Sequence, residues 1–348
     1  MKIGILTSGG DSPGMNTAVW AAARAAYSKG IEIVAIRHGY QGLMTNDIIP
    51  LTQDAAESML NMGGTRIRTS RCKEMRTLQG RKHAVKTLKE NKIDGLIVCG
   101  GDGSFRGAEK LSNLGIATIG IPGTIDNDLA YTDYTIGFDT ACNNIVENVM
   151  KIRDTMRSHN RIGIVEVMGR NCGDLALLAG MASGADYVLV PEKQGEFKSK
   201  YNIDEVFRHV KETWYSGKHY AIIIIAEGVG KDNNDRAYNL RKLLEAKIDE
   251  HNKMLMDTEE SPELIVTEVR ETVLGYLQRG GSPTVQDRRL ATESAIKAVE
   301  LLEAGETNRV VGIRENKIIH MDTDEALSIV KEFDDILLSH VNSLLTSR

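Results

Sequence analysis

The stretch Pro-Gly-Thr-Ile-Asp-Asn-Asp, residues 122–128, places two carboxylates two residues apart directly after the apolar run 115–121. Asn and Asp are common in turns because their side chains bond nearby backbone groups. Neighbouring carboxylates also repel each other, which raises the pKa of one of them. The stretch is therefore either a structural turn or a place where Asp126 or Asp128 takes a proton from a reacting group.

A second candidate loop is Cys-Gly-Gly-Asp-Gly-Ser-Phe-Arg-Gly, residues 99–107. Three glycines surround Asp102, so the backbone can approach an anion while a carboxylate stands within the same loop. A carboxylate among phosphates needs a cation between them, and Mg²⁺ is typically held by one or two carboxylates together with substrate phosphates. Asp102 is thus a candidate magnesium ligand; the alternative is that it caps the following helix.

Two further segments contain groups that are suited to phosphate binding. Residues 7–16, Thr-Ser-Gly-Gly-Asp-Ser-Pro-Gly-Met-Asn, follow an apolar run and precede a helical pattern, where free backbone N–H groups favour phosphate; a tight turn is the alternative. Residues 63–76 carry five cations within eleven positions: Arg66, Arg68, Arg71, Lys73 and Arg76. Because no aromatic residue is interleaved among them, base stacking is not supported, and arginine contacts to a transferring phosphoryl group fit better.

Cations also follow apolar runs later in the chain. Arg170 lies in a glycine turn after the run that ends at residue 167, and Arg270 and Arg279 lie in the stretch 269–283. Cations on separate loops indicate a substrate that itself carries phosphate. Glu227 ends the most apolar run; it is either exposed at the end of a strand or bonded to a ligand hydroxyl, and the sequence leaves both open.

The elements that must position these residues alternate along the chain. Short runs rich in β-branched residues predict strands at 2–7, 31–36, 94–100, 117–121, 161–167, 186–190, 220–226 and 264–269, and helical patterns lie at 15–27, 80–91, 104–113, 139–157, 174–183, 203–215, 235–252 and 285–303. This alternation predicts an α/β fold with largely parallel sheets covered by helices on both faces. Ligands of such sheets bind at the carboxyl ends of strands, where the loops above lie.

Composition narrows the function classes. A chain of 348 residues suggests about two domains, and a net charge of −5 argues against a nucleic-acid surface over the whole protein. The four cysteines form no C-x-x-C pair, and the apolar run near the N-terminus is too short for a signal peptide. The longest apolar run, 220–226, is far below membrane-spanning length. These features predict a cytoplasmic protein without membrane segments. The residues alone indicate a magnesium-dependent phosphotransferase that acts on a hydroxyl of an anionic small molecule.

Six of these motifs, taken in order, resemble the ATP-dependent 6-phosphofructokinase family: TSGGDSPGMN, GGDGS, PGTIDND, DYTIGFDTA, VEVMGR and LQRGGSP. The resemblance runs from residue 2 to about residue 315. It implies transfer of the ATP γ-phosphoryl group to O1 of fructose 6-phosphate with Mg²⁺ as cofactor. It also implies two Rossmann-like three-layer domains with the active site in the cleft between them, usually within an allosteric homotetramer. The expected ATP-binding domain comprises 1–137 and 278–328, and the expected sugar-binding domain comprises 138–277 and 329–348.

The resemblance also implies a role for each matching residue. Asp126 matches the general base, supported by Asp128, while Arg170 and Thr124 act on the reacting groups. The residues that match ATP contacts are Gly9, Tyr40, Arg71, Cys72, Arg76, Gly101, Asp102, Gly103 and Ser104, with Asp102 as the magnesium ligand. The residues that match sugar-phosphate contacts are Thr124, Ile125, Asp126, Arg161, Met168, Gly169, Arg170, Glu227, Arg270, Tyr276 and Arg279. Of these, Arg161 and Arg270 match arginines that a neighbouring subunit lends to the 6-phosphate.

The chain departs from the family pattern at several places. Tyr276 stands where many bacterial members have His, Cys72 stands where an aromatic residue often follows the ATP arginine, and the segment 228–262 is longer than its bacterial counterpart. In the family's effector site three cations are replaced, by Trp20, Gln53 and Ser216, whereas Arg24, Arg153 and Lys218 remain cationic. We therefore expect a weak or different response to the usual effectors.

Two other functions compete with this assignment. Pyrophosphate-dependent relatives typically carry Asp at the position of Gly103 and Lys at the position of Gly123. A side chain at residue 103 would enter the space of the ATP α-phosphate, so the glycine favours ATP. A non-catalytic sugar-phosphate sensor is the second alternative, and it is disfavoured because Asp102 and Asp126 are both present.

Overall fold

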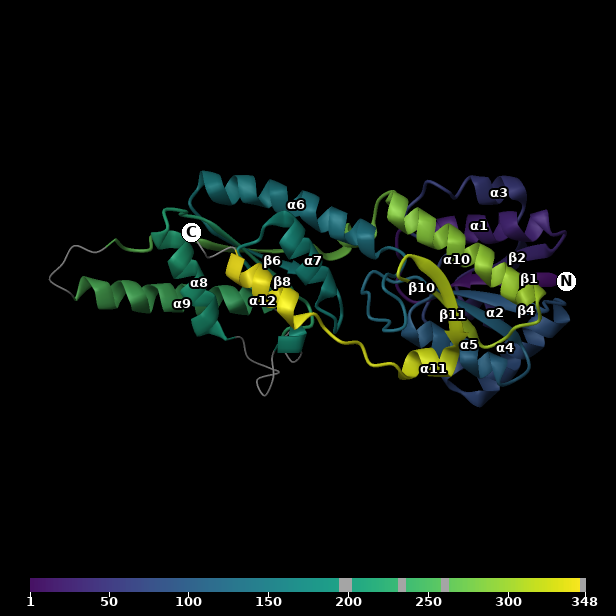
Figure 1. Cartoon of the computed structure of the whole chain (residues 1–348). Coiled ribbons are helices and arrows are strands. Elements are labelled where there is room, and N and C mark those ends of the chain that lie inside the picture. Colours follow the sequence, from purple (N-terminus) through teal and green to yellow (C-terminus); the bar gives the residue numbers. More distant parts are fainter. Residues whose placement is uncertain (194–201, 231–235, 258–262, 345–348) are drawn as a thin grey trace. The chain divides into compact units, whose positions relative to one another are not determined.

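The computed structural model describes residues 1–193, 202–230, 236–257 and 263–344. The chain divides into two compact units, and each is continuous in space but not in sequence (Figure 1). Unit 1 comprises residues 1–141 and 279–332, and unit 2 comprises 142–278 and 333–348. The chain thus passes between units at 141, 278 and 332, where the sequence analysis expected 137, 277 and 328.

Unit 1 is built on a seven-stranded sheet with the order β11-β10-β5-β4-β1-β2-β3. Its strands are β1 (Lys2–Thr7), β2 (Glu32–Ile36), β3 (Ile48–Pro50), β4 (Gly95–Gly100), β5 (Ala117–Pro122), β10 (Arg309–Arg314) and β11 (Lys317–Asp322). The five inner strands pair in parallel, whereas β3 and β11 pair antiparallel at the two edges. The carboxyl ends of β1, β4 and β5 therefore lie side by side, with their loops at one edge of the sheet.

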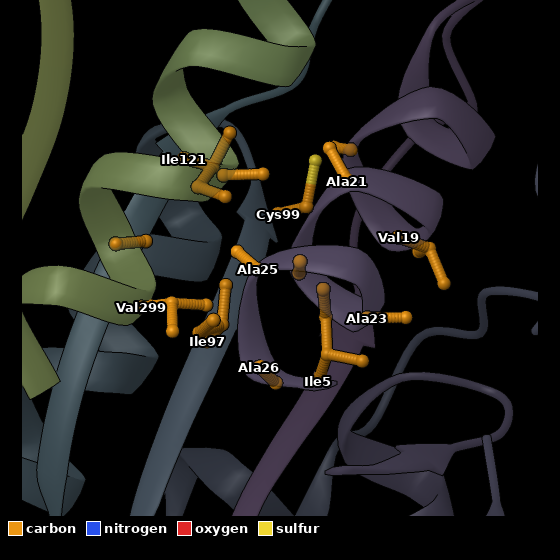
Figure 2. Close-up of a cluster of buried hydrophobic side chains, with 14 of the residues drawn as sticks. Ile5, Val19, Ala21, Ala23, Ala25, Ala26, Ile97, Cys99, Ile121 and Val299 are labelled. Atoms are coloured by element: carbon orange, nitrogen blue, oxygen red, sulfur yellow. The ribbon is translucent and has the colours of Figure 1, made fainter. Parts of the chain in front are cut away.

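Helices cover both faces of this sheet. They are α1 (Met15–Ser28), α2 (Tyr40–Thr45), α3 (Gln53–Glu57), α4 (Leu78–Glu90), α5 (Asp102–Ser112), α10 (Val285–Glu303) and α11 (Thr323–Ser328), with a 3₁₀ turn at Glu74–Arg76. On one face, the alanines of α1 and the small and aliphatic residues of α10 pack on Ile5, Ile97 and Ile121 (Figure 2). On the other face, residues of α2, α4 and α5 pack on Leu6, Leu96 and Val98. Alternate residues of β1 and β4 thus serve opposite layers, because successive side chains of a strand point to opposite faces.

Unit 2 holds a four-stranded parallel sheet with the order β7-β8-β6-β9. Its strands are β6 (Ile162–Val167), β7 (Tyr187–Leu189), β8 (Ala221–Ala226) and β9 (Val269–Val273). Its helices are α7 (Asp174–Ser183), α8 (Ile203–Tyr215), α9 (Arg236–Met256) and α12 (Asp335–Leu344), with a 3₁₀ turn at Gly275–Arg279 that ends at the unit boundary. Helices α7 and α12 contact β7, while α9 contacts β6 and β9. Helix α6 (Phe138–Ser158) begins in unit 1 and continues into unit 2.

The α/β fold predicted from the sequence is confirmed, with corrections at its margins. The strand predicted at 264–269 was misplaced, because pairing with β6 begins only at Val269 and extends to Val273. That strand alternates polar and apolar residues, and only the apolar run before it was recognised. The inner strand β10, the edge strands β3 and β11 and the helices α2, α3, α11 and α12 were not predicted either. None of the helices in the described part of the chain combines the length and the apolarity that a membrane crossing needs.

Candidate active site

The loop 122–128 leaves β5 through a sharp and crowded turn. A Cβ atom at Gly123 would lie 2.8 Å from Sγ of Cys99, so only glycine fits there. Asp126 N–H donates to Oγ1 of Thr124 at 3.2 Å. Asn127 adopts the left-handed conformation with φ of 50°, which Asn tolerates better than most residues. The stretch is therefore a structural turn, and Asp126 and Asp128 are half-buried on it while Ile125 and Asn127 are buried.

Three contacts brace this loop. Thr135 Oγ1 donates to the Thr124 carbonyl at 2.6 Å, and the Asn127 side-chain amide donates to the Asp133 carbonyl at 3.3 Å. The Lys331 ammonium donates to the Asn127 carbonyl. Oδ1 of Asp126 is buried. A half-buried carboxylate on a braced loop has the restricted geometry that a general base needs.

The glycine-rich loop after β4 lies directly beside the loop 122–128, as the sequence analysis expected. Gly123 N–H donates to the Gly100 carbonyl at 2.9 Å, and a Cβ atom at Gly101 would lie 3.7 Å from Cβ of Thr124. A Cβ atom at Gly103 would meet nothing within 4 Å, so open space adjoins that residue. The two loops are therefore neighbours, with Asp102 following one and Asp126 on the other.

Asp102 is not the N-cap of the helix that follows it, which was the structural role considered from the sequence. Helix α5 begins at Asp102 itself, its N-cap is Gly101, and no side chain caps it. The Asp102 carboxylate instead pairs with Arg106 one turn later, at 3.1 Å, and about a third of its side chain is exposed. Within the described residues no group of three or more His, Cys, Asp or Glu side chains is arranged to hold a metal ion. A magnesium ion at Asp102 would therefore take most of its ligands from substrate oxygens and water.

Tyr40 supports the glycine-rich loop from within the core. Its hydroxyl donates to the Ser104 carbonyl at 2.6 Å, and a Cβ atom at Gly107 would lie 3.0 Å from the Tyr40 ring. The side chain is buried, and this burial raises the pKa of the phenol above its usual value. Its hydroxyl is thus engaged with the protein backbone. Ser104 is buried as well, with Oγ 3.6 Å from where a Cβ atom of Gly9 would stand.

The N-terminal loop lies against both the glycine-rich loop and Arg279. Ser8 N–H donates to the Cys99 carbonyl at 2.9 Å, and Gly9 has φ of 90°. Arg279 donates to the Asp11 carbonyl at 2.9 Å, and its guanidinium would be 2.8 Å from a Cβ atom at Gly10. The structure therefore places Arg279 beside the predicted phosphate loop of unit 1. Arg279 thus belongs to unit 1, whereas Arg161 and Arg270, the other arginines predicted for the 6-phosphate, belong to unit 2.

The basic segment 63–76 is tied to the end of β1. Asn16 donates to the carbonyls of Met62 and Gly63 at 3.0 and 3.1 Å, and Thr69 Oγ1 donates to the Gly9 carbonyl at 2.8 Å. Within this segment Arg71 and Arg76 are exposed. Cys72 is half-buried, and burial raises the pKa of its thiol. Asn16 is a positioning residue that the sequence analysis did not identify, although its place at the start of a helix after a glycine-rich loop offered a signal.

In unit 2, Glu227 has a third role beyond the two considered from sequence. Its carboxylate accepts the Arg170 N–H at 2.7 Å, while Arg170 itself adopts φ of 56° with an exposed side chain. Gln278, which is buried, accepts the Met168 N–H at 2.9 Å. A Cβ atom at Gly169 would lie 2.5 Å from the Cys172 carbonyl, so the turn requires glycine. Glu227 and Gln278 thus hold the turn 168–170, and Gln278 is a second residue that the sequence analysis missed.

The parallel pairing of β6 and β9 brings Arg161 and Arg270 to one carboxylate. Glu268 Oε2 lies 2.6 Å from Arg161 and 2.8 Å from Arg270, and these two arginines lower the pKa of Glu268. The two predicted phosphate ligands are therefore neighbours on the same unit. Tyr276 is 84% exposed, so its ring is free of the core.

The cations of the predicted effector site are engaged within each unit. In unit 1, Arg24 pairs with Glu57 at 2.8 Å. In unit 2, Lys218 pairs with buried Asp186, and Arg153 donates to the Gly184 carbonyl at 2.8 Å. These contacts do not test the expected weak response to effectors, which stays a prediction.

Taken together, parallel sheets whose glycine-rich, acidic and basic loops gather at strand ends define a class of α/β proteins that bind phosphorylated ligands. The family model described as phosphofructokinase matches residues 2–302, and the chain belongs to that family. It is 51% identical over 332 residues to the ATP-dependent 6-phosphofructokinase of Clostridioides difficile (strain 630), covering 95% of each chain. It is 48% identical over 335 residues to the enzyme of that name from Clostridium botulinum (strain Hall), covering 96% of each.

Similar solved structures also carry the name phosphofructokinase. The structure of phosphofructokinase from Pichia pastoris in the T-state is similar with a TM-score of 0.83 and 35% identity, over 94% of this chain and 35% of that chain. The chain thus spans about a third of the Pichia protein. A pyrophosphate-dependent phosphofructokinase from Marinobacter aquaeolei shares the fold, with a TM-score of 0.81 and 21% identity over 96% of this chain and 86% of that one.

Proposed function

We propose that this protein is an ATP-dependent 6-phosphofructokinase, which transfers the γ-phosphoryl group of ATP to O1 of fructose 6-phosphate and yields fructose 1,6-bisphosphate and ADP. The observation that supports the proposal is the contact between the loops 100–103 and 122–128, because one loop carries Asp102 and the open space at Gly103 and the other carries Asp126. Phosphoryl transfer depends mainly on positioning of the reactants and on stabilisation of charge. The two loops supply the carboxylates that we propose for these tasks, Asp126 as the general base and Asp102 as the magnesium ligand.

Asp126 is the proposed general base and takes the proton of the sugar O1 hydroxyl as that oxygen attacks phosphorus. Its half-buried place on a braced loop supports this role. Asp128, on the same loop, supports the site electrostatically, and Thr124 Oγ1 holds the Asp126 N–H. Arg170 is the proposed stabiliser of charge on the moving phosphoryl group, because a guanidinium donates several hydrogen bonds in a fixed fork.

Unit 1 is the proposed ATP side. The α- and β-phosphates lie along the backbone of Gly9, Gly101 and Gly103, with Ser104 beneath, and Arg71 and Arg76 supply positive charge. Tyr40 acts from behind the loop through Ser104, and Cys72 lines the approach. Asp102 would hold Mg²⁺, which supplies charge neutralisation between the phosphate oxygens when it is bound. The partly exposed carboxylate at the start of α5, next to the open space at Gly103, supports that role.

Unit 2 is the proposed sugar side. The turn Met168–Gly169–Arg170 and Glu227 position the fructose moiety, with Ile125 contributing from the catalytic loop. Arg161 and Arg270 bind the 6-phosphate, which would displace or share their contact with Glu268. Tyr276 replaces the family histidine as a hydrogen-bond donor. We further propose a homotetramer in the cytoplasm, in which a neighbouring subunit provides Arg161 and Arg270.

The residues at two positions favour ATP over pyrophosphate as the phosphoryl donor. A side chain at Gly103 would point into the open space beside the phosphate loop, so glycine leaves that space to a larger donor. At Gly123 a Cβ atom would also lie 3.1 Å from Cε of Met15, so the lysine found in pyrophosphate-dependent relatives would not fit this turn. The non-catalytic sensor is disfavoured because Asp102 and Asp126 are both present.

The test is an assay of fructose 6-phosphate phosphorylation by the purified protein, with ATP or pyrophosphate and with or without Mg²⁺. We expect turnover with ATP that requires Mg²⁺. Preference for pyrophosphate under matched conditions would replace the donor assignment, and no turnover with either donor would favour the sensor.

A further inference from the structure

A lysine outside the family match contacts the proposed catalytic loop. Lys331 lies between α11 and α12, two residues before the chain leaves unit 1, whereas the family model ends at residue 302. Its ammonium group donates to the Asn127 carbonyl. From this contact we infer that Lys331 is a positioning residue, which holds the loop and keeps Asp126 ionised for catalysis. The inference rests on the proposed role of Asp126.

The contacted carbonyl is the one between the two acidic residues. Asn127 follows Asp126 and precedes Asp128, and consecutive Cα atoms are about 3.8 Å apart. The ammonium group is therefore bound to the short stretch of backbone that carries both carboxylates. The other braces of the loop, from Thr135 and Asp133, involve only neutral groups. Lys331 alone among these three braces brings a charge.

This charge has a definite effect on the proposed base. Two carboxylates on one short loop repel each other and raise the pKa of one of them, whereas a nearby cation lowers it. A general base has to be ionised before it accepts a proton. Removal of the Lys331 charge should therefore raise the pKa of Asp126 and move the acid limb of the rate profile to higher pH.

Other charged groups lie on the elements around the loop, and all but one of those named here contact other parts of the protein. They are Asp102 and Arg106 on α5, which pair with each other; Asp133, which accepts the Glu315 N–H at 2.8 Å; Arg314, which donates to the Ala130 carbonyl at 3.3 Å; and Glu332, which is exposed next to Lys331. None of these contacts is made to the backbone between Asp126 and Asp128. Lys331 is thus the charged group that the structure joins to that backbone, within the contacts described for these residues.

The experiment compares three replacements of Lys331 that separate charge from hydrogen bonding. Lys331→Met removes both, Lys331→Gln keeps a donor without charge, and Lys331→Arg keeps both. Lys29→Met is the control, because Lys29 is an exposed lysine of unit 1 that follows the end of α1 and pairs with Glu303 of α10. Steady-state rates with ATP and fructose 6-phosphate are measured from pH 5.5 to 9, and thermal unfolding reports the folded state of each variant.

We expect Lys331→Met to lower kcat about tenfold at pH 7 and to shift the acid limb of kcat upward by about 0.5–1 pH unit. The KM for ATP should stay within about twofold, since ATP contacts lie on other loops. Lys331→Gln should show the same shift with a smaller loss of kcat, whereas Lys331→Arg and Lys29→Met should keep the wild-type limb.

The inference would be overturned if the acid limb of the kcat profile stayed at its wild-type pH in Lys331→Met and Lys331→Gln. A loss of thermal stability in these variants would not rescue it, because a purely structural contact would lower stability without moving the limb. If Lys331→Met does not fold, the Gln and Arg variants decide between the same two outcomes. Wild-type protein that lacks fructose 6-phosphate kinase activity would instead contradict the proposed function. Active wild type with inactive Asp126→Asn but normal Lys331 variants would contradict this inference alone.

Discussion

At the scale of single residues, the turn chemistry and the proposed proton transfer of the loop 122–128 belong to the same side chains. The Asn127 conformation and the Thr124 contact to Asp126 are typical of a turn. The same contacts fix the backbone that carries the Asp126 carboxylate. The structural interpretation of this stretch as a turn and its catalytic interpretation as the site of a general base are therefore compatible. Mutation has to show whether the catalytic role exists.

Asp126→Asn should lower kcat by about 10²–10⁴-fold while the KM for ATP changes little, because the amide keeps the size of the side chain but cannot accept the proton. Steady-state kinetics with both substrates test this. Asp133→Asn is the control, since the Asp133 carboxylate faces the Glu315 N–H. Near-wild-type turnover in a folded Asp126→Asn protein would remove Asp126 from the role of base.

Gly103 allows a graded test of donor choice. Gly103→Ala adds one methyl group to open space and should reduce kcat/KM for ATP by less than about tenfold. Gly103→Asp adds volume and negative charge beside phosphates and should reduce it by about 10²-fold or more, because like charges in a site repel strongly. Equal effects of the two variants would argue against an ATP phosphate at this position.

At the scale of elements, the start of helix α6 depends on a buried carboxylate from α10. Asp287, 1% exposed, accepts N–H groups of Gly137 and Thr140 at 2.7 and 2.8 Å. It thereby satisfies backbone donors at a helix N-terminus that would otherwise be unpaired. The helix that links the two units thus begins on a contact between segments about 150 residues apart.

This contact predicts a pH-dependent stability. Burial raises the pKa of Asp287 from 3.8 to about 6, so the folded protein binds a proton between these values more readily than the unfolded chain does. The contribution of Asp287 is therefore fully present below pH 3.8 and is lost as the pH rises through about 6. The total change is on the order of 3 kcal/mol.

Urea unfolding of wild type and Asp287→Asn between pH 4 and pH 7 measures this change. The stability of Asp287→Asn relative to wild type should rise with pH over that range. Asp322→Asn is the control, because Asp322 caps the short helix α11 from a less buried position. A difference between Asp287→Asn and wild type that is flat across the range would show that Asp287 titrates normally in the folded state.

At the scale of the whole molecule, the proposed assignments divide the reaction between the two units. The loops 7–16, 99–107 and 122–128, which carry the proposed base and phosphate contacts, belong to unit 1. The proposed sugar-phosphate ligands Arg161, Arg170, Glu227 and Arg270 belong to unit 2. Arg161 and Arg270 share Glu268 and are half-buried or exposed. Such arginines suit a phosphate that reaches them from another chain.

If a neighbouring subunit supplies these arginines, a mixture of two defective variants should regain activity. Arg161→Ala should raise the half-saturating fructose 6-phosphate concentration at least about tenfold, since a lost charge-assisted contact costs about 1.5–3 kcal/mol. A mixture with Asp126→Asn, after subunit exchange, should recover part of the activity through hybrid oligomers. No recovery, with exchange shown by labelled subunits, would place the arginines and the base in one chain.

The sequence alone predicted the α/β class and most of the chemistry. Buried parallel strands read as continuous apolar runs, and glycines beside acidic residues marked the loops at residues 100–103 and 122–128. The boundaries of β9, the inner strand β10 and the edge strands β3 and β11 were not predicted; an edge strand need not be apolar. The residues alone suggested a magnesium ligand at Asp102 and a proton acceptor at Asp126 or Asp128. The choice of Asp126 and the roles of individual arginines came from the family resemblance, and all of these roles stay predictions until they are tested.

Only the tertiary structure decided which residues support these loops. Tyr40 behind Ser104, Glu227 and Gln278 on the turn 168–170, and Lys331 on Asn127 are brought to their partners from distant parts of the chain. No local pattern reveals such contacts, because the side chain and the backbone group that it binds lie 57 to 204 residues apart. The sequence determined what kinds of groups end each strand, since those groups are local. The order of strands within each sheet decided which of them meet, since pairing between strands is set by long-range packing.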